Sequence, residues 1–325
     1  MMEYLYYLGF GFLAFIVSFI LTKNLIPRLK RYEMTGKDEN KKEAPEIPEM
    51  GGIAIVAGFT AGLLLAIFMN SFMGFQFNLV YVLAALITIH SIGFIGMTDD
   101  LLNLPQWIKA MLPLFAAIPL IATQAAGSTS IMLPFIGHID FGILYIMVLI
   151  PLGIAVASNL TNMLAGFNGM ETGMGVVMFS ALSIIGITNN SIETVILSIS
   201  MLGALLAFLW FNWYPARVFP GDVGNLTMGV VVASTVIIGN IESAGAILVI
   251  PYVIDFFIKA KNKFPHTHQE IGEDGKLRPK DGKIRGFVHL VMKLANGITE
   301  KNLTLVFIGL EIIFALVAIA LYAKV

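Results

Sequence analysis

The sequence contains no cysteine and little charge. Its 325 residues include no Cys, and Asp, Glu, Lys and Arg together account for 13%. The absence of cysteine excludes disulfides and thiolate-ligated metal sites. The low charge, with 57% hydrophobic residues and a mean hydropathy of +0.84, excludes an ordinary soluble domain and indicates an integral membrane protein.

The stretches without charged residues are long enough to cross a membrane. Because a bilayer core takes about 20 apolar helical residues, the uncharged stretch 50–98 holds two spans. We predict an all-α integral membrane protein, with about ten transmembrane helices in one polytopic domain over residues 1–325. The predicted spans are 4–25, 51–69, 78–98, 108–125, 141–158, 172–189, 193–211, 225–240, 243–259 and 302–323. The first is not expected to be a cleaved signal peptide, because it lacks a basic start and a small-residue cleavage site.

The basic residues predict the orientation. Nineteen of the twenty Lys and Arg residues lie in or next to loops on one side of the predicted membrane, and only Lys324 lies on the other. By the positive-inside rule these loops are cytosolic and both termini are outside. The predicted cytosolic loops are 26–50, 99–108, 159–171, 212–224 and 260–301.

Small structured elements are expected in the loops. The pairs Asp274-Gly275 and Asp281-Gly282 suit tight turns, and residues 129–139 favour a β-hairpin on the outside. Apolar residues at helical spacing in 287–294 predict a short helix on the inner membrane surface.

Polar residues concentrate at the cytosolic ends of the predicted helices. They occur at Asp99-Asp100 and in the segments SNLTNMLAGFNGMETG (158–173), FNWYPARVFPGDVGNLTMG (211–229) and NKFPHTHQE (262–270). Each alone has a structural alternative, such as a helix cap, a turn or solvent-exposed histidines. Together on one membrane face, acids, amides, basic groups and glycines form a set that could hold a divalent cation against phosphates.

These segments resemble the motifs of the polyprenyl-phosphate N-acetylhexosamine-1-phosphate transferases (glycosyltransferase family 4). The resemblance rests on four motifs. They are TDDLLNL with Lys109 ten residues after Asp99, NLTNMLAGFNGMETG, NWYPARVFPGD and the loop GKDENKKEAPEIPEMGG at 36–52. They occur in order over essentially the whole chain. The branch that starts dolichol-linked oligosaccharides in eukaryotes is more similar than the bacterial phospho-N-acetylmuramoyl-pentapeptide transferases. His266-Thr267-His268 departs from the eukaryotic Arg-His-Arg pattern and is closer to the bacterial histidine motif.

The resemblance implies transfer of an N-acetylhexosamine-1-phosphate, above all GlcNAc-1-phosphate, from a UDP-sugar to a polyprenyl or dolichyl phosphate. UMP is released, and the product starts a lipid-linked glycan for protein N-glycosylation. Undecaprenyl phosphate for cell-envelope polysaccharide is the alternative acceptor. The implied cofactor is Mg²⁺, with Mn²⁺ as an alternative. The expected partners are the UDP-N-acetylhexosamine, the lipid phosphate, the bilayer and a second copy of the chain, but not nucleic acid, and the active site is expected to face the cytosol from the cell membrane.

The resemblance also implies roles for individual residues. The implied metal ligands are Asp222 and Asn162. The implied catalytic residues are Asp99, Asp100, Lys109, His266 and His268. The implied substrate-binding residues are Asn103, Asn159, Gly166, Phe167, Asn168 and Arg217.

The two adjacent aspartates are expected to have different tasks. On a helix their side chains diverge by about 100°. A phosphate monoester has its second pKa near ~6 and needs no strong base at neutral pH. We therefore expect Asp100 to orient Lys109 or the water shell of the metal, and Asp99 to hold the lipid-phosphate site in register.

Two other classes of protein are alternatives. An ion-coupled transporter also places acids in a membrane domain, but its sites lie near the midplane, whereas the acids here lie at one interface. A lipid phosphatase or a non-transferring scaffold is the third hypothesis, and the residues implied to bind uridine argue against it.

Overall fold

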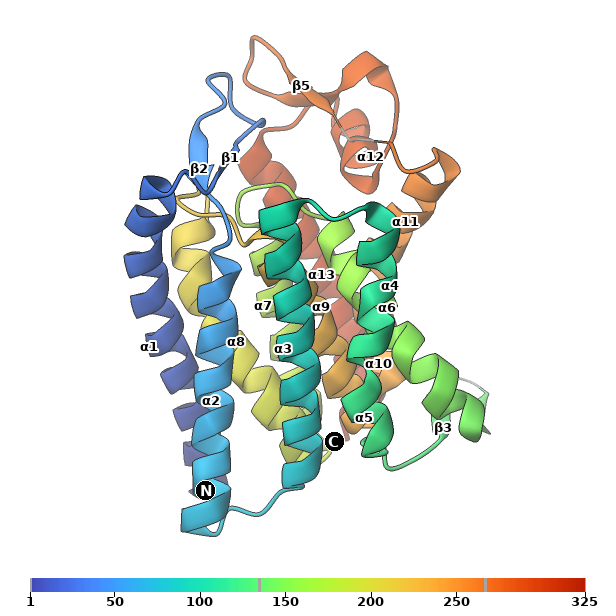
Figure 1. Cartoon of the computed structure of the whole chain (residues 1–325). Coiled ribbons are helices and arrows are strands. Elements are labelled where there is room, and N and C mark those ends of the chain that lie inside the picture. The colour runs from blue at the N-terminus through green and yellow to red at the C-terminus, as the bar shows by residue number, and fades with distance from the viewer. Residues whose placement is uncertain (1, 134–135, 266–267, 325) are drawn as a thin grey trace.

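A computed structural model describes residues 2–133, 136–265 and 268–324 of the chain. It shows a bundle of helices that run along a common axis, with small hairpins at its ends (Figure 1). Among the described residues, eight helices are long and apolar enough to cross a membrane. They are α1 (Met2–Arg31), α2 (Gly52–Met73), α3 (Leu79–Leu102), α6 (Ile150–Met163, preceded by the π-helical turn Tyr145–Leu149), α7 (Met170–Thr188), α8 (Ile192–Asn212), α9 (Gly221–Ile238) and α13 (Glu300–Tyr322). The predicted all-α integral membrane fold is confirmed.

Two further predicted spans are interrupted helices. α10 (Glu242–Leu248) and α11 (Ile250–Lys261) meet at an angle of 61°, where Pro251 removes a backbone donor. α4 (Gln106–Ala116) and α5 (Ile118–Ala122) form a shorter apolar segment, broken just before Pro119. All ten predicted ranges therefore overlap helices, but ten spans are reached only if both interrupted segments also cross.

α9 lies at the centre of the bundle, since 94% of its membrane window is buried by its neighbours. Small residues let the helices approach closely. A Cβ added to Gly229 of α9 would collide with the backbone of Ala157 in α6, and one added to Gly203 of α8 would collide with Gly11 of α1. This packing brings Asp222, in the first turn of α9, to the middle of one end of the bundle.

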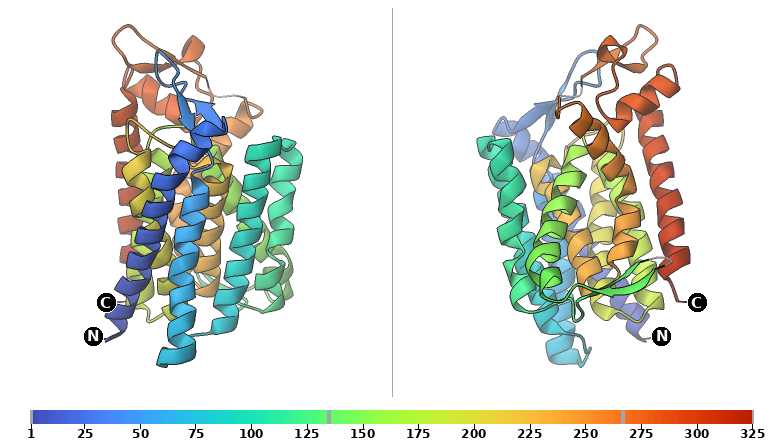
Figure 2. Two further views of the ribbon diagram at one scale, coloured as in Figure 1. Left: turned by 60° about the vertical axis from the view of Figure 1, so that its left-hand side comes forward. Right: turned by 90° about the vertical axis from the view of Figure 1, so that its right-hand side faces the viewer.

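The two ends of the bundle differ in charge. Both termini lie at the same end of the bundle (Figure 2), and the hairpin of β3 (Ser130–Leu133) and β4 (Gly137–Asp140) lies at this end too. The segments that carry nineteen of the twenty basic residues lie at the opposite end. The hairpin predicted at 129–139 is thus confirmed, and the termini lie opposite the basic loops.

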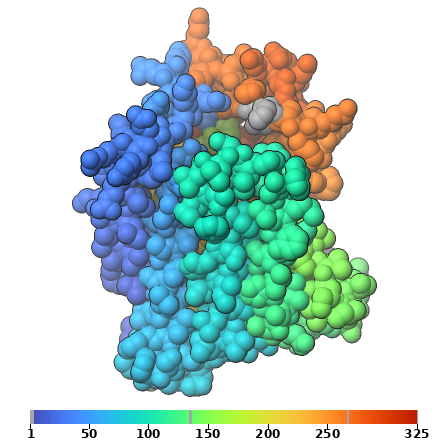
Figure 3. All heavy atoms as spheres, viewed as in Figure 1, coloured from blue at the N-terminus to red at the C-terminus, as the bar shows by residue number. Residues whose placement is uncertain are grey.

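The basic end carries two more hairpins and a short helix. β1 (Thr35–Lys37) pairs with β2 (Glu46–Pro48), and β5 (Gln269–Ile271) pairs with β6 (Leu277–Pro279) around the predicted turn at Asp274-Gly275. Asp281-Gly282 also forms a turn, within the 3₁₀ segment Lys280–Gly282. Both hairpin regions cover this end of the bundle, blue and orange in Figure 3.

The short helix predicted at 287–294 is present as α12 (Phe287–Leu294). Its buried side includes Val288 and Met292, which pack against the protein, whereas Leu294 is 79% exposed. Contact of this helix with the membrane surface stays a prediction.

The helices reach further into the predicted cytosolic loops than expected. α3 continues to Leu102, so only residues 103–105 of the predicted loop 99–108 lie between α3 and α4. Asp99 and Asp100 are therefore part of a helix, and the direction of each side chain is set by the rotation of α3.

Candidate active site

The last turn of α3 meets the first turn of α9 through Asp100. Its carboxylate accepts hydrogen bonds from the backbone N–H groups of Asp222 (2.7 Å) and Val223 (3.1 Å). Both donors belong to the start of a helix, where N–H groups lack partners within the helix and favour negative charge. Gly221 has φ +66° and approaches Asp100 so closely that an added Cβ would lie 2.7 Å from its Oδ2. Asp100 thus fixes the backbone that presents Asp222.

Lys109 lies between two carboxylates. Its Nζ is 2.5 Å from Oδ2 of Asp99 and also forms an ion pair with Oδ2 of Asp222. Lys109 and Asp99 are buried, with 8% and 7% exposure. The other oxygen of Asp99 accepts from the N–H of Leu104 at 2.7 Å, which holds the turn between α3 and α4. One ammonium facing two carboxylates leaves one negative charge at this point of the bundle.

This arrangement corrects one expectation. Asp99, and not Asp100, contacts Lys109. The two aspartates do have separate tasks, as their divergence on the helix predicts. Asp99 is directed toward α4 and Asp100 toward α9.

A cavity of about 370 Å³ opens beside Asp222. Its lining comes from the β1–β2 hairpin, from the α6–α7 and α8–α9 connections and from β5. The lining residues are Gly36, Lys37, Asp38, Glu39, Asn40, Glu49, Asn162, Ala165, Gly166, Phe167, Glu171, Asn212, Phe219, Pro220, Gly221, Asp222, Asn225 and Gln269. Four of the predicted site residues, Asn162, Gly166, Phe167 and Asp222, therefore face one cavity.

Amide groups stand beside Asp222 in the wall of the cavity. Nδ2 of Asn225 donates to Oδ1 of Asn162 at 3.4 Å, and the hydroxyl of Thr161 donates to the backbone oxygen of Asn225 at 2.8 Å. Oδ1 of Asn225 is buried and has no hydrogen-bond partner among the described residues. A carboxylate with amide oxygens is a donor set that suits Mg²⁺.

Acidic groups by themselves do not form a metal site here. Within the described parts of the chain, no group of three or more His, Asp or Glu side chains could hold a metal. A cation bound next to Asp222 would therefore depend on amide oxygens and on oxygens supplied by a ligand.

Glu49 adds a further acid to the cavity. It follows β2, and burial, together with the negative charge of Asp222, raises the pKa of its carboxyl. Glu49 is therefore more readily protonated than an exposed glutamate.

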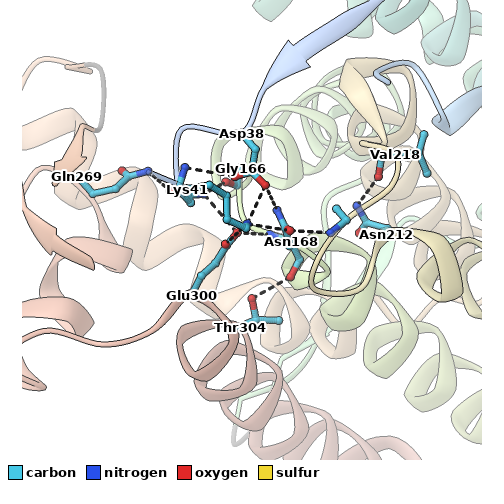
Figure 4. Close-up of polar contacts among 11 residues, drawn as sticks. Asp38, Lys41, Gly166, Asn168, Asn212, Val218, Gln269, Glu300 and Thr304 are labelled. Carbon is cyan, nitrogen blue, oxygen red and sulfur yellow. Dashed lines mark hydrogen bonds and ion pairs between the residues drawn. The ribbon is translucent and has the colours of Figure 1, made fainter. Parts of the chain in front are cut away.

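Asn168 lies in a buried polar network behind the cavity (Figure 4). Its Oδ1 accepts from Nζ of Lys41 (3.1 Å) and from the N–H of Ala216 (2.8 Å), and its Nδ2 donates to Asp38 (3.1 Å). Its backbone N–H donates to Glu300 at 2.8 Å. With 1% exposure and no place in the cavity lining, Asn168 connects loops in this structure, and its implied contact with uridine stays a prediction.

Lys41 joins the first hairpin region to the last helix. Its Nζ lies 2.8 Å from Asp38 and 2.5 Å from Glu300, and it stands 4.6 Å from the centre of the Tyr214 ring. Burial opposes the charged form, but hydrogen bonds and ion pairs with the two acids prevail and raise the pKa of Lys41. This ammonium holds the wall of the cavity in place.

Comparison with known proteins identifies the family of the chain. The model of the family described as glycosyl transferase family 4 matches residues 81–240. A putative UDP-N-acetylglucosamine–dolichyl-phosphate N-acetylglucosaminephosphotransferase of Saccharolobus solfataricus is 37% identical over 312 residues, which cover 95% of this chain and 94% of that protein. The chain belongs to glycosyl transferase family 4.

Other members of the family are also similar. The UDP-N-acetylglucosamine–dolichyl-phosphate N-acetylglucosaminephosphotransferase of Dictyostelium discoideum is 28% identical, over 92% of this chain and 86% of its own. A phospho-N-acetylmuramoyl-pentapeptide-transferase of Halalkalibacterium halodurans is 31% identical, over 80% and 87%. The family match spans the segment from Asp99 to Asp222, which holds the Lys109 ion pairs.

Three residues implied to bind substrate lie away from the cavity of this family 4 protein. Asn103 is exposed and ends α3 with φ +50°. Nδ2 of Asn159 donates to the backbone oxygen of Ala155 in its own helix at 2.8 Å. The guanidinium of Arg217 lies 4.7 Å from the centre of the Phe211 ring. None of the three lines the cavity, and their contact with substrate stays a prediction.

The histidine segment of the family 4 protein lies at the edge of the site. His268 is exposed and is not among the cavity-lining residues, whereas the next residue, Gln269, lines the cavity and donates a hydrogen bond to Asn40. His266 lies outside the described residues. The fourth polar segment therefore reaches the cavity through Gln269.

Fourteen of the eighteen cavity-lining residues were not predicted as site residues. Among them are the polar residues Glu49, Glu171, Asn225 and Gln269. Asn225 was not found because Asp222 was predicted to lie in the loop 212–224 and the next span to begin at 225. Since α9 begins at Gly221, the two residues are three positions apart in one helix and share a face. Glu171 lies in the polar segment 158–173, and its Oε1 accepts from the backbone N–H of Gly166 in the cavity wall.

Proposed function

We propose that the chain transfers N-acetylglucosamine-1-phosphate from UDP-GlcNAc to a dolichyl-type polyprenyl phosphate and releases UMP. The product would start a lipid-linked glycan for protein N-glycosylation. The observation that carries the proposal is the ion-pair arrangement of Asp99, Lys109 and Asp222 at the wall of a cavity of about 370 Å³. The names of relatives that match nearly the whole chain supply the substrate class.

The chemistry exchanges one phosphoanhydride for another. An oxygen of the lipid phosphate attacks the phosphorus that carries the sugar, and the bond from that phosphorus to the bridging oxygen of UMP breaks. Such a transfer needs positioning and charge neutralisation more than it needs a base. Because the bonds formed and broken are alike, we expect an equilibrium constant near unity and a reverse reaction with UMP.

The residues at the wall of the cavity and directly behind it suit this task. Lys109 does not line the cavity but is paired with Asp222, which does. The carboxylates of Asp99 and Asp222 hold its ammonium in place, so its proposed contact with a phosphate oxygen needs no further ordering of the side chain. Gly166 and Phe167 offer backbone and ring contacts to the nucleoside. Asp100 holds the first turn of α9 and thereby the position of Asp222.

Mg²⁺ is the proposed cofactor, with Mn²⁺ as the alternative. Asp222 and Asn162 would hold it, since both line the cavity and offer the oxygen donors that hard cations prefer. When bound, the cation would neutralise the negative charge that develops on UMP.

We also propose that the cavity faces the cytosol from the cell membrane. The proposal rests on the nineteen basic residues at the end of the bundle that carries the site. A homodimer is a further proposal that rests on the family resemblance alone.

The test is release of UMP by the purified protein in detergent. Labelled UDP-GlcNAc and dolichyl phosphate are supplied with Mg²⁺ or with a chelator, and UMP is separated chromatographically. We expect UMP only when the lipid phosphate and the metal are both present, and almost none from Asp222→Asn. Asp140→Asn, at the opposite end of the bundle, is the matched control and should keep full activity.

The same assay separates the alternatives. A panel of UDP-GlcNAc and UDP-GalNAc with dolichyl or undecaprenyl phosphate identifies the donor and the acceptor. Ion-coupled uptake into sealed vesicles without any UMP would contradict the proposal and favour the transporter.

A further inference from the structure

The wall of the cavity holds a buried polar atom that no described residue satisfies. Asn225 is 6% exposed, and its Oδ1 has no hydrogen-bond partner among the described residues. A buried acceptor without a partner has a cost in stability, because it has lost its hydrogen bonds to water and gained none in the fold. Asn225 also lines the cavity together with Asp222 and Asn162. A cation bound to Oδ1 of Asn225 would remove this cost.

We propose that Oδ1 of Asn225 is a third protein ligand of the divalent cation, beside Asp222 and Asn162. The inference deepens the proposed function and rests on it. Asn225 and Asp222 are three residues apart in α9, so their side chains lie on the same face of the helix. Asn162 projects from α6, and the two helices are held together where the Thr161 hydroxyl bonds the backbone of Asn225.

The contact between the two amides favours a shared cation. Nδ2 of Asn225 lies 3.4 Å from Oδ1 of Asn162, which is long for a hydrogen bond, so little is lost if it breaks.

Charge also favours a cation at this point. Asp99 and Asp222 share the single charge of Lys109, so the cluster keeps one negative charge. Asn225 adds an oxygen without adding charge. With Asp222 and Asn162 it would supply three of six ligands, leaving places for phosphate oxygens and water.

The experiment measures metal binding without turnover. The full chain is purified in detergent and freed of metal. Mn²⁺ is then titrated with saturating UDP and no lipid acceptor, and free Mn²⁺ is followed by its electron paramagnetic resonance signal. We expect Asn225→Ala to weaken Mn²⁺ binding about tenfold and Asn225→Asp to bind at least as tightly as the native chain. Thr227→Val is the control, because Thr227 is also buried in α9 with an unpartnered hydroxyl but does not line the cavity.

The outcomes separate this inference from the proposed function. If Asp222→Asn loses Mn²⁺ while Asn225→Ala binds it as the native chain does, the third ligand is wrong and the metal site stands. If neither the native chain nor any variant binds Mn²⁺ with UDP, the metal site and its third ligand both fail. Thermal unfolding checks that each variant is folded. Should Asn225→Ala not fold, weaker binding by Asn225→Asp than by the native chain overturns the inference.

Discussion

The carboxylate of Asp100 accepts hydrogen bonds from the backbone N–H groups that begin α9, and Asp222 is the first of these residues. Two acids 122 positions apart are thus joined through backbone and not through a shared cation. Asp100 determines where Asp222 stands, while Asp99 and Lys109 determine the charge around it.

Asp100→Ala should lower the rate of transfer by about a hundredfold, because an error of ~1 Å in a reacting group has costs of that order. The start of α9 would lose its acceptor and Asp222 would shift. Steady-state rates with UDP-GlcNAc and lipid phosphate measure the effect. A rate equal to that of the native chain would show that α9 holds Asp222 without Asp100.

Asp99→Asn should lower the rate at every pH. The substitution removes one charge that holds Lys109 but no proton acceptor that the reaction needs. The measurement is the pH–rate profile of the variant beside that of the native chain. Loss confined to low pH, with recovery at high pH, would instead identify Asp99 as a base.

Lys109→Met should destabilise the folded protein by about 3 kcal/mol and nearly abolish transfer. Removal of the ammonium leaves the buried carboxylate of Asp99 facing the half-buried carboxylate of Asp222. Adding Asp99→Asn should restore part of the stability, so the double variant should lose less than the sum of the two single losses. Thermal unfolding in detergent measures the stability loss of the two single variants and of the double variant. A loss in the double variant equal to the sum of the two single losses would contradict the coupling between Lys109 and Asp99.

Lys41→Met should loosen the first hairpin region. Lys41 binds both Asp38 and Glu300, so its loss leaves two buried acids unpaired. We expect faster hydrogen exchange over residues 35–48 and a higher KM for UDP-GlcNAc. Lys42→Met is the matched control, since the Nζ of Lys42 makes only a 3.5 Å contact with a backbone oxygen. Equal hydrogen-exchange rates over residues 35–48 in Lys41→Met and Lys42→Met would contradict the proposed role of the Lys41 ion pairs.

Acid should destabilise the protein through His289. The side chain is fully buried, and burial, together with the charges of Arg285, Lys259 and His268, lowers its pKa to about 4. In the unfolded chain the pKa is near ~6.5, so between these values only the unfolded state binds the proton. Stability should therefore fall by about 2 kcal/mol from pH 7 to pH 5.

Replacement of His289 tests this pH dependence. His289→Gln keeps an acceptor for the Arg285 N–H, which now donates to Nδ1 at 3.2 Å, but does not titrate. Unfolding temperatures at pH 5 and 7 should differ less in this variant than in the native chain. His138→Gln, on the exposed β4, should keep the native difference.

Much of the fold could be predicted because it depends on local properties of the chain. Hydropathy marks a span wherever it occurs, and all ten predicted ranges overlap helices. Interruptions at Pro119 and Pro251 were missed, because proline bends a helix by an amount that depends on its neighbours. The resemblance to the family likewise selected Asp222, Asn162, Gly166 and Phe167, which do line one cavity.

The pairing of residues within the site was less predictable. Asp100 was expected to orient Lys109 or the water shell of the metal, whereas the structure pairs Lys109 with Asp99. The burial of Asn168 among Lys41, Asp38 and Glu300 was not predicted either, and its contact with the nucleotide stays a prediction. The helical period of 3.6 residues shows that two adjacent side chains point in different directions. It does not show which residue of another helix each side chain will contact.

The sequence by itself determined that this chain is a helical membrane protein with its polar chemistry at one charged end, because hydropathy and charge act residue by residue. Only the tertiary structure decided which acid holds the lysine, which acid holds the start of α9 and which amide oxygen lacks a partner. Those contacts depend on the rotation and close packing of helices whose sequences lie far apart.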